Sequence, residues 1–154
     1  MKKAVCVVLL LSVALFCMGC ADSTEDSTYT ATAKIRLALP QTDADDLIRI
    51  YLVDNAESLV KFDSVLLSVI ENEALSCSVE ELSSLIRVQR DSEEKSAYYI
   101  SVIAKSGEDA VRIANAVATA FCERVNNVYG PDGMKEPVAK VLEKATAPNT
   151  KDET

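Results

Sequence analysis

Histidine is absent from the 154-residue chain, and its absence excludes several kinds of chemistry. A serine or cysteine nucleophile activated by an imidazole, a histidine zinc site and a proton switch near neutral pH all need that side chain. The adjacent carboxylates of Glu80-Glu81 and Glu93-Glu94 have the residue type of a glycosidase acid–base pair, but no aromatic wall for a sugar accompanies them and tryptophan is absent. We therefore expect a protein that is not an enzyme and needs no cofactor.

Two groups of charged residues could instead hold a ligand. Asp43, Asp45 and Asp46 could bind calcium, but the glycine and distal glutamate of a calcium loop are missing, whereas acidic residues are favourable where a helix begins. Four basic residues could line a groove for an anionic sugar or a lipid-linked phosphate; they are Arg87, Arg90, Lys105 and Arg112. Charges that keep strand edges from pairing wrongly explain this basic set more simply. We therefore expect no metal site and favour ordinary surface charge over a sugar groove.

The first twenty residues combine a short basic start with an uncharged run. Lys2 and Lys3 precede residues 4–19, which carry no charge. As a helix this run would reach roughly 24 Å, which is less than the ~30 Å hydrocarbon core of a bilayer. The pattern is typical of a signal peptide, so we expect residues 1–19 to be removed and residues 20–28 to form a polar tether.

The end of this segment, Phe16-Cys-Met-Gly-Cys20, resembles the bacterial lipobox, in which a small residue precedes a cysteine that receives diacylglycerol. Gly19 and Cys20 match that pattern, whereas Cys17 and Met18 depart from it. The resemblance implies lipidation of Cys20 and a membrane-anchored chain on the extracytoplasmic side, either periplasmic or extracellular. The alternative is an uncleaved anchor, which would export the domain equally.

Cys77 and Cys122 are the two cysteines that remain after Cys20. In an oxidising compartment they could form a disulfide. Two free, buried thiols are the alternative, because spacing in the sequence does not show whether the two Cα atoms lie within bonding range. Both alternatives stay open at this point.

The charge of the exported chain limits its partners. Without Lys2 and Lys3 it carries 14 basic residues against 24 acidic ones. An acidic surface repels phosphate backbones and anionic headgroups, so we expect no nucleic-acid partner and no electrostatic docking to a membrane. Contact with the membrane is expected through the lipid anchor instead.

Periodic patterns predict one domain over residues 29–148. Alternating polar and apolar residues predict a strand that begins at Tyr29 and ends before Pro40. Helical spacing follows over 47–70, in two or three pieces. The most regular helix is expected over 108–128, where the apolar stripe consists of Val111, Ala114, Ala118, Phe121, Val125 and Val128.

Shorter signals complete the predicted fold. Ser78-Val-Glu-Glu81 is a capping box that begins a short helix. Strands over 86–90 and 98–104 enclose a polar turn and form a hairpin, and a last strand lies within 137–146. The order β-α-α-β-β-α-β predicts an α/β (α+β) fold with a single mixed sheet of about four strands and helices packed on one face. Residues 149–154 are expected to be a disordered tail.

Several of these segments together resemble the periplasmic domain of Wzz-type chain-length determinants, the polysaccharide co-polymerases. The quoted matches are Tyr29-Thr-Ala31, the segment 62–70, Ser78-Val-Glu-Glu-Leu82, Ile86-Arg-Val88, Ile100-Ser-Val102, Asp109-Ala-Val-Arg-Ile-Ala-Asn-Ala116 and the segment 138–148. Asn115 is the most telling residue, because alanine would suit the interior of a helix better. Family members carry two membrane spans with a proline-rich segment before the second, and this chain departs from that pattern.

The resemblance implies a non-catalytic scaffold that assists the biosynthesis or chain-length control of a surface polysaccharide such as capsule, O-antigen or exopolysaccharide. The partners it implies are further copies of the chain, a two-span co-polymerase, or the polysaccharide itself. A stand-alone lipoprotein that binds an extracellular ligand or protein with the same fold is the alternative, since a fold does not determine a function.

Overall fold

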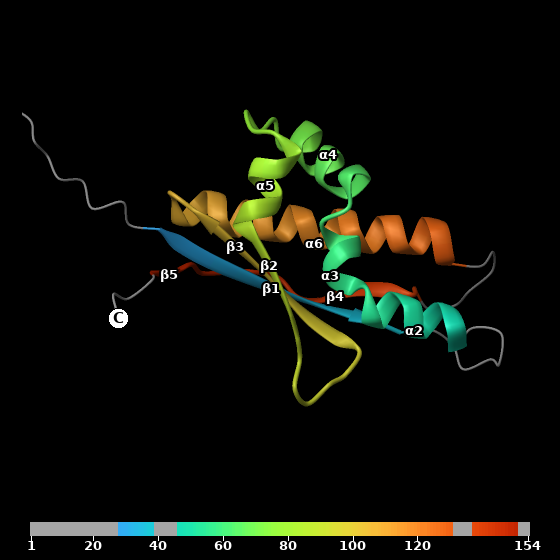
Figure 1. The fold of residues 1–154 in the computed structure, drawn as a ribbon. Helices are drawn as coiled ribbons and strands as arrows, with labels where there is room; N and C mark the ends of the chain where they lie inside the picture. Colours follow the sequence, from blue (N-terminus) through green and yellow to red (C-terminus); the bar gives the residue numbers. More distant parts are fainter. Residues whose placement is uncertain (1–27, 39–45, 131–136, 151–154) are drawn as a thin grey trace, which may run out of the picture.

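A computed structural model describes residues 28–38, 46–130 and 137–150. Figure 1 shows an open sheet covered by helices. The elements in chain order are β1 (Tyr29–Leu37), α2 (Asp46–Asp54), α3 (Ala56–Val60), α4 (Asp63–Asn72), α5 (Val79–Leu85), β2 (Ile86–Arg90), β3 (Ala97–Ala104), α6 (Gly107–Tyr129), β4 (Ala139–Glu143) and β5 (Asn149–Thr150). No helix of the described ranges has both the length and the apolar character needed to cross a bilayer.

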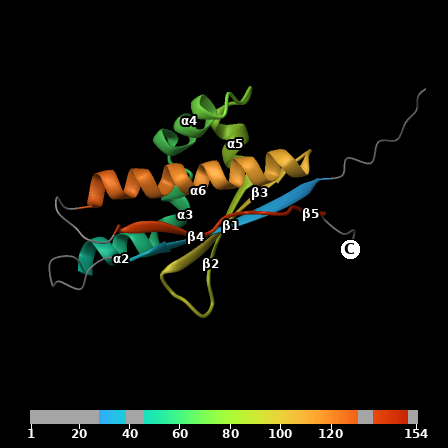
Figure 2. The same cartoon turned by 180° about the vertical axis from the view of Figure 1, so that it is seen from behind.

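The sheet confirms the predicted fold class. Its strand order is β2-β3-β1-β4, with β5 paired to the start of β1. The helices lie on one face of the sheet, as the two opposite views show (Figures 1 and 2). Every pairing is antiparallel, so the sheet is not mixed in strand direction. Residues 46–85 form four short helices: three over 46–72, within the two or three pieces predicted there, and α5, which begins at the predicted capping box.

Alternation along β1 determines which face is covered. Ala31, Ala33, Ile35 and Leu37 are buried against the helices, while the residues between them face the open side of the sheet. The predicted hairpin is confirmed: β2 pairs with β3 from Ile86↔Val102 to Arg90↔Tyr98. The same period of two therefore gives one face to the core and the other to water.

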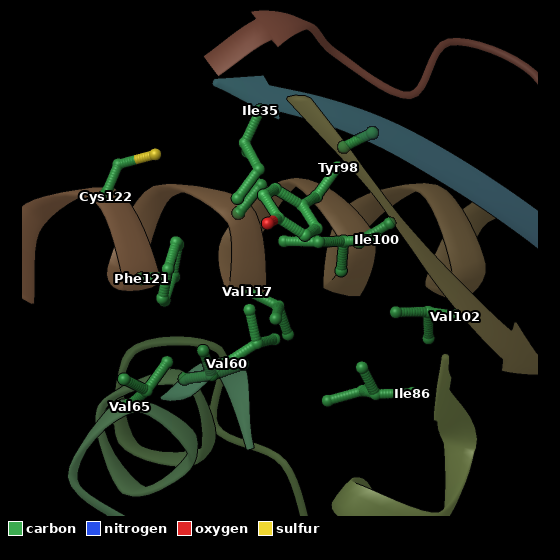
Figure 3. Packing of buried hydrophobic residues seen from close by; sticks show 14 of the residues in the cluster. Ile35, Val60, Val65, Ile86, Tyr98, Ile100, Val102, Val117, Phe121 and Cys122 are labelled. Carbon is green, nitrogen blue, oxygen red and sulfur yellow. The ribbon is translucent and has the colours of Figure 1, made fainter. Parts of the chain in front are cut away.

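Helix α6 spans the middle of the core. Its buried side chains meet the inward residues of β1 and β3 on one side and the α3–α4 helices on the other; Figure 3 shows Ile35 and Ile100 on the sheet side and Phe121 pointing toward Val65. Ser106 caps its first turn by accepting a hydrogen bond from the backbone N–H of Asp109 at 3.0 Å. The predicted extent of this helix is confirmed within two residues at each end.

Asparagine side chains on α6 hold the C-terminal segment in place. The amide of Asn126 donates to the carbonyl of Ala139 and accepts from its N–H, both at 2.8 Å. Asn115 forms the same pair of hydrogen bonds with Ala145, both at 2.9 Å. β4 lies at the edge of the main strand order, where unpaired backbone groups are costly, and Asn126 supplies Ala139 with the partners that a further strand would otherwise provide. Asn115 does the same for Ala145, two residues after β4 ends.

Part of the expected disordered tail is ordered. Asn149 and Thr150 pair with the first two residues of β1. Pro148 packs on the first residue of α6, where a Cβ on Gly107 would lie 2.6 Å from the proline Cγ, and the Tyr29 ring lies 3.6 Å from the same point. The beginning of β1, the beginning of α6 and the end of the described chain therefore meet at one end of the domain.

Lys34, Asp91 and Tyr99 connect β1 to the hairpin. The Lys34 Nζ lies 2.7 Å from Asp91 Oδ2, and the Tyr99 hydroxyl donates to the same oxygen at 2.9 Å. The other oxygen, Asp91 Oδ1, accepts from the backbone N–H groups of Glu93 and Glu94. The hydrogen bond with Lys34, followed by these donors, lowers the pKa of Asp91, and the hydrogen bond with Asp91 raises the pKa of Lys34.

This cluster predicts a specific loss of stability in acid. Because the folded-state pKa of Asp91 lies below its ordinary value of 3.8, the carboxylate stabilises the fold above about pH 4 and loses that contribution as the pH falls through the folded-state pKa. The free energy of unfolding of the Asp91→Asn variant should therefore differ most from wild type at pH 6, and the difference should shrink toward pH 2. A difference that stays constant over this range in urea titrations would contradict the prediction.

Candidate functional site

The predicted lipidation residue, Cys20, lies outside the described residues. Cys77 and Cys122 are both free thiols in the structure. Cys122 is buried on the side of α6 that faces the sheet (Figure 3), whereas Cys77 lies in the connection between α4 and α5 on the other side of that helix. Burial, followed by the charge of Glu123, raises the pKa of Cys122 to about 12, so this thiol stays protonated and is a poor nucleophile at neutral pH.

The four basic residues considered for a sugar groove are not gathered in one place. Arg87 is exposed on β2, whereas Arg112 lies on α6 in the helical layer. Arg112 contacts Glu73 and Asp109, each at 2.8 Å, and so links the end of α4 to the first turns of α6. Its hydrogen bonds lower the pKa of Asp109 and raise its own. Within the described ranges, no three acidic or cysteine side chains are placed to hold a metal ion.

A polar hollow of about 400 Å³ lies beside the contact between Arg112 and Glu73. Its walls include Arg112, Asn115, Thr119 and Lys144. The guanidinium of Arg112 is occupied by carboxylates, and the amide of Asn115 is occupied by the backbone of the C-terminal segment. Two of the polar side chains that could orient a ligand here, Arg112 and Asn115, are therefore already used to hold the fold together.

A second hollow has a different lining, and we call it the aromatic groove. It has a volume of about 200 Å³ and is lined by Tyr51, Leu59, Phe62, Val65, Phe121, Arg124, Val125, Val128 and Tyr129. Four of the seven aromatic residues that the structure describes lie here. Three of the lining side chains are half exposed: Tyr51 at 49%, Phe62 at 56% and Val128 at 49%. Apolar side chains left exposed together in this way are typical of a contact surface.

The elements around the groove explain its shape. The corner between α3 and α4 forms one wall, the C-terminal half of α6 forms the other, and Tyr51 is contributed by α2. Phe121, which is only 1% exposed, belongs to the core and forms the floor. The periodicity of α6 predicted that Val128 is part of the buried stripe, and this was wrong: α4 covers the middle of α6 but leaves its last turns uncovered.

Phe62 occupies a position that another residue would stabilise better. It is the N-cap of α4, with φ −69° and ψ 137°, and its side chain forms no cap hydrogen bond. A serine, threonine or aspartate at an N-cap typically contributes about 1 kcal/mol to stability. The chain instead places a half-exposed phenyl ring there. Departures from a local rule of this kind are expected where a residue serves a function.

Arg124 is the charged residue of the groove. It is exposed on α6, and no carboxylate of the described ranges forms an ion pair with it. A guanidinium without an ion pair among these residues, beside an apolar surface, can bind a carboxylate in a bidentate manner. The groove therefore presents an apolar floor with one cation at its edge.

Sequence patterns did not identify this groove as a site. Its residues come from four segments, and each looks like ordinary core or surface in its own helix. The one available signal was Phe62, an aromatic residue directly before the acidic first turn of α4. No protein-family model and no curated protein matches the chain.

Proposed function

We propose that the chain is a lipid-anchored, Wzz-like extracytoplasmic domain that assists the assembly or chain-length control of a surface polysaccharide without catalysing a reaction. The role in surface-polysaccharide assembly and the family are inferred from the resemblance of the segments between Tyr29 and Pro148. The lipid anchor is inferred from the resemblance of the sequence around Cys20 to a lipobox. The aromatic groove is the observation that supports action through contacts, because an exposed apolar surface beside a cation suits recognition of another protein.

The main alternative is a stand-alone lipoprotein that captures a small extracellular ligand. Ligand pockets usually measure about 300–1,000 Å³ and bury most of the ligand. The aromatic groove, at about 200 Å³, is smaller, and in the larger polar hollow Arg112 and Asn115 are engaged in the fold. Both observations favour a protein partner over a small ligand.

The anchor at Cys20 provides the first test. We expect a deletion strain to show a shifted distribution of surface-polysaccharide lengths, which the wild-type gene restores and a gene encoding Cys20→Ala does not. The reason is that the unlipidated domain no longer stays at the membrane where the polymer is assembled. The Cys17→Ala variant is the matched control and should restore the profile. Identical profiles in all strains would contradict the proposal and favour the ligand-binding lipoprotein.

A further inference from the structure

We infer that the aromatic groove is the docking site for a helical segment of another extracytoplasmic protein, which inserts one apolar side chain and places a carboxylate on Arg124. This inference rests on the proposed function in that the chain acts through protein contacts, and it identifies the surface and the chemistry of the partner. Three observations carry it: the composition of the lining, the size of the groove and its place in the domain.

The composition matches the centre of a protein interface. Tyrosine, phenylalanine and arginine are enriched where a few residues contribute most of the binding energy. Here Tyr51, Phe62 and Arg124 line one hollow and are all exposed. Arg124 has no ion-pair partner among the described residues, and the complementary group is a carboxylate.

The size and walls of the groove indicate one anchor side chain on a helix. A volume of about 200 Å³ accommodates a leucine or phenylalanine side chain more readily than a larger organic ligand. The walls are helices, so an extended peptide finds no strand edge here with which to pair its backbone. A helix that lays its apolar face into a groove between helices is an established mode of recognition, and it places a carboxylate one turn away from the anchor.

The aromatic groove and the residue that follows the proposed tether lie at opposite ends of the domain. The start of α6 at Gly107 lies beside Tyr29, the first residue of β1, to which the tether leads. Val125 lies about 27 Å further along the same helix. Figure 1 accordingly shows the start of β1 and the end of α6 at opposite ends of the domain. The groove is therefore at the end of the domain away from Tyr29, the residue that follows the proposed tether, and this placement suits contact with another protein.

A peptide of known sequence tests this inference on the full chain in nanodiscs. The probe is a fluorescein-labelled, alanine-rich helical peptide with one phenylalanine and a glutamate four residues later; a second peptide carries lysine in place of the glutamate. By fluorescence anisotropy we expect the glutamate peptide to bind and the lysine peptide to bind at least about tenfold more weakly. The Arg124→Glu variant should reverse this preference.

Variants of the rim separate docking from folding. Phe62→Ser removes the ring but supplies the missing N-cap of α4, so we expect the helical content to persist while affinity for the glutamate peptide falls at least about tenfold. Leu67→Ala is the matched control, since Leu67 is also half exposed on α4, at 47%, but does not line the groove. Equal binding by wild type and Phe62→Ser, or no binding of either peptide, would overturn the inference.

A membrane surface is the competing occupant, and tryptophan fluorescence distinguishes it. The chain has no tryptophan, so Phe62→Trp places a single reporter at the rim. Its emission should shift to the blue only when the glutamate peptide is added. A blue shift in nanodiscs alone, with quenching by brominated acyl chains, would overturn the inference in favour of lipid. An unchanged polysaccharide profile with intact peptide binding would instead remove the proposed function and leave the docking site.

Discussion

Replacing both Asn115 and Asn126 with alanine is expected to lower the free energy of unfolding by about 4–6 kcal/mol, roughly half from each site. Each amide satisfies one backbone N–H and one backbone C=O of the C-terminal segment. The residues that they hold, Ala139 and Ala145, are 1% and 6% exposed. Water therefore cannot readily replace the lost hydrogen bonds, and each buried group left unpaired costs about 1–3 kcal/mol.

The two sites should act almost independently. They lie eleven residues apart on α6, about 16 Å along the helix, and share no partner. Urea denaturation of the single and double variants measures the two losses and their sum. Asn72→Ala is the control, because the exposed amide of Asn72 donates a hydrogen bond to the Ser68 hydroxyl and to no backbone group of the described residues; its effect should stay within about 0.5 kcal/mol. A double variant as stable as wild type would show that the amides do not hold the C-terminal segment.

Phe121→Ala should destabilise the domain by about 3–5 kcal/mol, the usual range for removing a buried phenyl ring. Phe121 is 1% exposed and points from α6 toward the α3–α4 corner, where Figure 3 shows it close to Val65. Its removal leaves a cavity that the helices can close only in part, so the loss of stability includes a cavity cost. Phe121→Leu keeps most of the volume and should cost less than half as much.

Phe121→Ala should also change the aromatic groove, because Phe121 belongs to both the core and the groove. Phe121 forms the floor of the groove, so Phe121→Ala should deepen it, whereas the exposed Phe62 contributes to the rim and little to the core. Thermal unfolding followed by circular dichroism should therefore show a much larger loss for Phe121→Ala than for Phe62→Ala. Equal losses at the two positions would contradict this division between floor and rim.

Local patterns were sufficient to predict most of the elements. The alternation in β1, the capping box at Ser78 and Glu81, the hairpin from Ile86 to Ala104 and the extent of α6 are all confirmed. Each depends on interactions between residues close in sequence, such as side-chain alternation, N-cap hydrogen bonds and helical spacing. Strand direction and the pairing of Asn149 and Thr150 with β1 depend on distant partners and were not predicted correctly.

For function, the sequence by itself determined the exclusion of histidine chemistry, the acidic balance of the chain and the resemblance of Phe16–Cys20 to a lipobox. Asn115 stood out in the sequence as a polar residue one step from the apolar stripe of its helix, but its partner, Ala145, lies thirty residues away and was known only from the fold. The aromatic groove was decided by tertiary structure alone. α4 packs on the middle of α6 and leaves Val128 and Arg124 uncovered beside Phe62, and no period within a single helix encodes where a neighbouring helix ends.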